Sequence, residues 1–129
     1  MEKKLIKTHR DLEVYKTSFD IAMQIFDKSK SFPIEERYSL TDQIRRSSRS
    51  VCANLGEAWR KRRYEALFIS KLSDAEAEAA ETQVWLEYAV SCKYMDRKTA
   101  ADLYERYNQI LGTIVGMIHH SDSWIIKKR

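Results

Sequence analysis

Basic side chains are concentrated in one part of the chain, where they could bind phosphate groups. Residues 1–63 carry fifteen Lys or Arg against nine Asp or Glu, a net charge of +6, whereas residues 64–95 carry two against six, a net charge of −4. Lys and Arg bind nucleic acids mainly by neutralising backbone phosphates. The candidate nucleic-acid contacts are Arg45, Arg46, Arg49, Arg60, Lys61, Arg62 and Arg63.

Two other sets of side chains could bind metal ions or transfer protons. Asp74, Glu78 and Glu81 follow one another at i, i+4 and i+7, so they share one face of a helix. Carboxylates in such a row can act as general acids or bases, but pairing with a basic neighbouring helix is the favoured interpretation. His119 and His120 would point about 100° apart on a helix, and no histidine follows a glutamate by three residues, so a di-metal bundle site is not predicted.

No spacing in the chain is typical of an enzyme. It has no glycine-rich phosphate loop, nucleophile elbow or Cys/His cluster, and we expect neither catalysis nor a cofactor or metal. Cys52 and Cys92 are read as reduced thiols. The longest uncharged run, Tyr107–Ser121, is fifteen residues and shorter than the roughly 20 needed to cross a bilayer, so we expect a cytoplasmic location.

Helices must position these side chains. Three Gly and one Pro are too few for the turns of a sheet-rich fold, and 43% hydrophobic with 33% charged residues suits a soluble helical domain. Apolar residues at steps of three and four predict helices near 11–32, 34–62, 64–92 and 96–122, with a short basic C-terminal tail. Short connections predict one domain, an all-α, antiparallel up-down-up-down four-helix bundle.

The periodicity also assigns faces to the helices. In the first helix the core face is predicted to carry Leu12, Tyr15, Phe19, Ala22 and Phe26. In the second, a polar flank between the apolar and basic faces is predicted to pack against a neighbouring helix or another subunit; its residues are Gln43, Ser50 and Asn54. Stacking of bases on Trp59 or Tyr64 is a further hypothesis.

Residues 9–120 resemble a known family of four-helix bundles, whose founding members are encoded by intervening sequences in bacterial 23S ribosomal RNA genes. Two flanking motifs carry part of the resemblance, Asp11-Leu12-x-Val14-Tyr15 and Glu78-Ala79-x-Glu81-Thr82-x-x-Trp85-Leu86. Its most specific part is Phe32-Pro33-x-Glu35-Glu36-Arg37-Tyr38-x-Leu40-x-x-Gln43-Ile44-Arg45-Arg46-Ser47-Ser48-x-Ser50-Val51-x-Ala53-Asn54-Leu55. One departure is Gly56-Glu57-Ala58, where many members read Ala-Glu-Gly.

The resemblance implies an assembly and a class of partner. Members of the family form homopentameric rings, and a similar fold occurs in accessory proteins of diversity-generating retroelements, which bind a reverse transcriptase and nucleic acid. We therefore expect a self-associating bundle that binds RNA or a ribonucleoprotein. The alternative is an adaptor for a protein partner such as a reverse transcriptase, in which the basic residues only confer solubility or pair with the acidic third helix.

Overall fold

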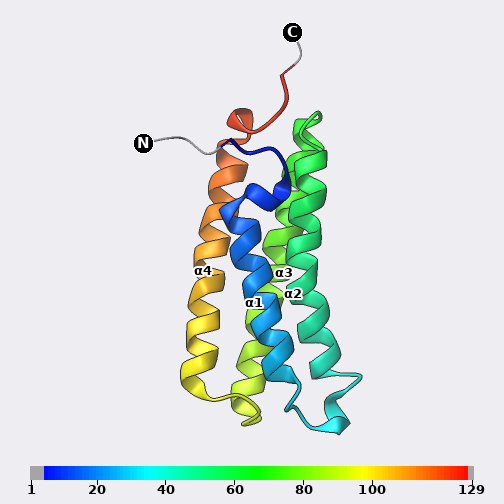
Figure 1. The fold of residues 1–129 in the computed structure, drawn as a ribbon, viewed down its shortest axis with the longest axis vertical. Coiled ribbons are helices and arrows are strands. Elements are labelled where there is room, and N and C mark those ends of the chain that lie inside the picture. The colour runs from blue at the N-terminus through cyan, green and yellow to red at the C-terminus, as the bar shows by residue number, and fades with distance from the viewer. Residues whose placement is uncertain (1–4, 128–129) are drawn as a thin grey trace.

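A computed structural model describes residues 5–127 of the chain. Within that range the chain is all-α, with four helices and no strand, as predicted. The helices lie side by side along the long axis of the molecule (Figure 1). Their bounds are α1 Glu13–Ser29, α2 Leu40–Arg60, α3 Glu65–Ser91 and α4 Arg97–His119. The last two residues of the predicted basic tail lie outside the described range.

Contacts between the helices define the packing. α2 packs against both α3 and α1, and α4 packs against both α3 and α1. In the α2–α3 pair, Arg46 contacts Glu78 and Glu57 contacts Lys71, so residue numbers rise along one helix as they fall along the other, and this pair is antiparallel. The core between the helices holds fully buried side chains from all four, including Ile21, Ile44, Leu72 and Tyr107.

The predicted start of the second helix near residue 34 is wrong. Ile34–Glu36 forms a short 3₁₀ turn, and α2 begins at Leu40. The Glu36 carboxylate accepts hydrogen bonds from the Ser39 hydroxyl (2.6 Å) and the Leu40 N–H (3.3 Å), and so caps the helix there. Its other oxygen accepts a hydrogen bond from the Tyr94 hydroxyl (2.9 Å), which ties this turn to the α3–α4 connection.

The first and fourth helices are also shorter than predicted. Asp11 caps a separate 3₁₀ turn, because its side chain accepts hydrogen bonds from the backbone of Lys7 and Thr8, and α1 begins only at Glu13. At the other end of the chain, Ser121–Ser123 forms another 3₁₀ turn after α4. None of the described helices combines the length and the apolar character that crossing a bilayer requires.

The predicted core face of α1 is displaced around the helix. Val14, Ile21 and Ile25, which lie outside the predicted face, are buried. Phe19, which was expected at its centre, is 51% exposed. This rotation directs the aromatic side of α1 toward the edge it shares with α2, where it can contribute to a surface site.

Candidate nucleic-acid interface

The basic side chains of α2 separate onto two sides of the helix. Arg45 and Arg49 lie on the side facing α1, with their guanidinium groups 4.8 and 5.6 Å from the centroid of the Phe26 ring. Arg45 also donates a hydrogen bond from Nε to the Ser29 hydroxyl at 2.8 Å. A guanidinium over an aromatic face is held in orientation while its outer edge remains available, so both groups can still contact a phosphate.

Arg46 points toward α3 and is already paired. Its guanidinium donates hydrogen bonds to Glu78 (3.1 Å) and Glu81 on α3, and its Nε donates to Gln43 (3.1 Å). Asp74 forms an ion pair with Lys71 at 3.8 Å. The predicted pairing with a basic neighbouring helix is confirmed for Glu78 and Glu81, whereas the partner of Asp74 lies on its own helix. Arg46 thus serves α2–α3 packing.

The basic run at the end of α2 is also divided. The Arg62 guanidinium stacks 3.5 Å from the Trp59 ring centroid, and its Nε donates to the Trp59 carbonyl (2.8 Å). Burial, together with the charge of Arg60, lowers the pKa of Arg62. Arg60, Lys61 and Arg63 remain exposed. Because Trp59 is only 6% exposed beneath Arg62, the hypothesis that bases stack on it is wrong, whereas Tyr64 is 60% exposed.

The polar flank of α2 is half-buried. The Asn54 amide donates to the Ser50 carbonyl at 2.9 Å, and Gln43 accepts the Arg46 hydrogen bond. These hydrogen bonds stay within α2, so the packing role of Gln43, Ser50 and Asn54 stays a prediction.

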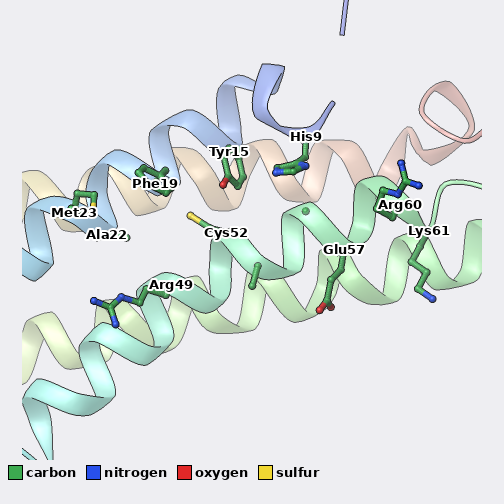
Figure 2. A pocket seen from close by; sticks show the side chains of 12 residues that line it. His9, Tyr15, Phe19, Ala22, Met23, Arg49, Cys52, Glu57, Arg60 and Lys61 are labelled. Carbon is green, nitrogen blue, oxygen red and sulfur yellow. The ribbon is translucent and has the colours of Figure 1, made fainter. Parts of the chain in front are cut away.

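A groove between α1 and α2 is the feature that periodicity did not reveal (Figure 2). It encloses about 710 Å³. Its α1 side includes Tyr15, Phe19 and Met23, with His9 from the preceding 3₁₀ turn, and Arg49 and Arg60 belong to its α2 side. The only signal in the sequence was the aromatic spacing of residues 15 and 19, which a core helix shows equally.

The groove contains no activated nucleophile. Cys52 lies on its α2 side, and burial raises the pKa of this thiol to about 11, so the reactive thiolate is scarce near neutral pH. Across residues 5–127, no group of three or more His, Cys, Asp or Glu side chains is placed to hold a metal ion. The surface therefore offers aromatic rings and cations for binding.

These features define an all-α, four-helix protein with a cationic and aromatic surface between α1 and α2. A family model described as 23S rRNA-intervening sequence protein matches residues 10–116. The chain belongs to this family, which confirms the resemblance stated above.

A solved structure supports the same assignment. It is the crystal structure of a protein with unknown function from the S23 ribosomal protein family of Bacteroides thetaiotaomicron VPI-5482. The two chains are 30% identical and superpose with a TM-score of 0.74, over 82% of this chain and 95% of the other. No curated protein matches the chain.

Proposed function

We propose that this protein is a non-enzymatic, self-associating bundle that binds RNA through the side of α2 that faces α1. The observation that carries the proposal is the row Arg45, Arg49 and Arg60. These residues have no ion pair with a described carboxylate, whereas neighbouring Arg46 is neutralised by two. Guanidinium groups without carboxylate partners are the groups that phosphates would contact.

This mode of binding has a defined energetic signature. Each phosphate neutralised by Lys or Arg releases counterions, so affinity should fall steeply with salt and depend little on sequence. Phe26 supports the proposal because it orients Arg45 and Arg49 before RNA arrives, which reduces the entropy lost on binding.

The proposed assembly is a cytoplasmic homopentameric ring of up-down-up-down bundles. The family resemblance supports this number, and the outward face of α3 supports self-association. Val84 and Tyr88 lie exposed there, away from the core of the subunit. Apolar and aromatic side chains exposed in this way are typical of protein contacts.

The RNA proposal is tested by fluorescence anisotropy of a labelled structured RNA and a DNA duplex across a salt series. We expect micromolar or tighter binding near physiological salt that is lost in Arg45→Glu/Arg49→Glu. The matched control is Arg97→Glu/Lys98→Glu, which removes the same charge from exposed positions on α4. Absence of binding at low salt, where electrostatic attraction is strongest, would refute the proposal.

A second candidate function is a protein adaptor. The exposed apolar side chains of α3 favour it, because they suit a protein partner better than a polyanion. Binding of a protein partner that persists at high salt, without any RNA affinity, would establish this function in place of the first.

A further inference from the structure

We propose that the α1–α2 groove binds unpaired bases of single-stranded RNA, with α1 supplying stacking surfaces and α2 supplying phosphate contacts. This inference rests on the proposed function and names the form of RNA that the same surface selects. It assigns a role to the three aromatic side chains that line the groove, namely His9, Tyr15 and Phe19, of which Tyr15 also packs against the core.

The α1 side of the groove presents consecutive rings. Tyr15 and Phe19 are one helical turn apart, with centroids separated by 6.1 Å and planes inclined by 36°. His9 meets Tyr15 edge to face at a centroid distance of 4.8 Å, which fixes the Tyr15 ring. Half of Phe19 is open to solvent, so a base can reach its face without displacing core side chains. Bases stack on such rings whatever their identity.

The α2 side of the groove is cationic. Arg49 and Arg60 lie along it, and Lys61 is at its end. The acidic residue of the groove lining, Glu57, forms an ion pair with Lys71 of α3 at 2.8 Å. Figure 2 shows its carboxylate on the far side of α2 from the aromatic rings. The charge left facing the groove is therefore positive and complementary to phosphate.

The two sides together match the geometry of a nucleic-acid strand. A single strand carries bases along one edge and phosphates along the other, as the groove carries rings on α1 and cations on α2. A duplex could use only the cations, because its bases are stacked inside. An acidic peptide could also satisfy the cations, but it does not carry a flat π-face at every unit of its backbone, as a nucleic-acid strand does.

Gly56 has no side chain to fill the groove, and a substitution there can block it. A Cβ added there would lie 3.7 Å from Cδ2 of His9, an ordinary van der Waals distance, so a longer side chain would extend into the groove. Gly is a poor helix former, and replacing it by Met within α2 favours the helix. Gly56→Met therefore blocks the groove without removing a charge or an aromatic ring.

The test compares a labelled single-stranded RNA of about 12 nucleotides with a duplex of the same sequence, by anisotropy. We expect Phe19→Ala and Gly56→Met each to weaken single-strand binding about tenfold while duplex affinity and the salt slope stay unchanged. The control Tyr104→Ala removes an exposed aromatic side chain from α4, away from the groove, and should change neither affinity. Circular dichroism establishes that each variant is folded.

A second measurement does not depend on any variant. RNA carrying 5-iodouridine, irradiated in complex with the wild-type protein, should crosslink to Tyr15 or Phe19, as mapped by mass spectrometry. Crosslinks confined to other elements would overturn the inference.

The remaining outcomes separate the inference from the proposed function. The inference would be overturned if the groove variants weaken binding of both RNAs equally, or change neither affinity. The proposed function would still stand if Arg45→Glu/Arg49→Glu abolishes binding. Failure of the wild type to bind either RNA would refute both. If the groove variants reduce the sedimentation mass and leave RNA affinity unchanged, the groove holds a second copy of the chain, which also overturns the inference.

Discussion

Arg46 of α2 donates a hydrogen bond to Glu78 of α3 over 3.1 Å, and this contact gives it a different role from its neighbours in the sequence. The same guanidinium also donates a hydrogen bond to Glu81, which accepts another from the Trp85 indole (3.0 Å). Arg45 and Arg49 instead lie over Phe26 of α1. One basic motif thus contributes both to the packing of the bundle and to the proposed interface.

Arg46→Gln and Arg49→Gln should affect different properties, the first stability and the second RNA affinity. We expect Arg46→Gln to reduce the free energy of unfolding by about 1 kcal/mol or less, because its ion pairs are partly exposed, and to leave RNA affinity unchanged. Arg49→Gln should weaken RNA binding and reduce the salt slope by about one. Urea denaturation and anisotropy measure the two effects. Equal losses of RNA affinity in both variants would contradict this division.

Glu36 should make stability dependent on pH. Hydrogen bonds from the Ser39 and Tyr94 hydroxyls and from the Leu40 N–H lower the pKa of Glu36. The hydrogen bond between Tyr94 and Glu36 also raises the pKa of Tyr94 to about 12. A carboxyl whose pKa is lower when folded stabilises the protein above its unfolded pKa of about 4.3, and this contribution is lost as pH falls through the folded value. Glu36→Gln should therefore lower Tm at pH ~7, with the difference shrinking as pH falls below the unfolded pKa of about 4.3. A difference in Tm that persists at acidic pH would show that the capping charge is not responsible.

The effects of substitutions at Thr82 and Ser47 on stability should be coupled, because a buried hydrogen bond joins the two side chains. Thr82 Oγ1 donates to Ser47 Oγ at 2.8 Å where α2 meets α3, and both side chains are fully buried. Thr82→Val should reduce the free energy of unfolding by about 1–3 kcal/mol, because it leaves the buried Ser47 hydroxyl without the hydrogen bond from Thr82. The double variant Ser47→Ala/Thr82→Val should cost less than the sum of the single variants, as measured by a denaturation cycle. Strict additivity would mean that the hydrogen bond contributes nothing.

The two cysteines should differ in reactivity. Cys92 is exposed at the end of α3, whereas Cys52 is buried with its pKa raised to about 11 by burial. Iodoacetamide at pH ~8 should therefore modify Cys92 about tenfold or more faster than Cys52, as followed by peptide mass spectrometry. In guanidinium chloride the two rates should converge. Similar rates in the folded protein would show that the α1–α2 groove opens readily.

The polar flank of α2 should affect assembly or stability. Replacing Gln43, Ser50 and Asn54 together by Ala should lower either the sedimentation mass or Tm, because these half-buried groups were predicted to pack against a helix or a subunit. The control Gln109→Ala/Thr113→Ala changes exposed polar positions of α4. If mass and Tm are both unchanged by the triple substitution, the predicted packing role is wrong.

Much of the fold could be predicted because helical periodicity is local. The apolar face of the second helix is buried, with Leu40, Ile44, Val51, Leu55 and Ala58, and α3 begins and ends within a residue of the predicted bounds. In α1, aromatic and aliphatic residues occupy adjacent faces, and their spacing does not show which face meets the core. Phe19 was therefore assigned to the core although Ile21 and Ile25 fill it.

The sequence by itself determined the helices, the basic character of α2 and the family. Only the tertiary structure decided that Arg46 faces carboxylates on α3, that Arg62 covers Trp59, and that the aromatic side of α1 borders a cationic groove. The physical reason is that spacing along a helix specifies which side chains share a face. The rotation of each helix against its neighbours then selects which of those faces becomes core, ion pair or open surface.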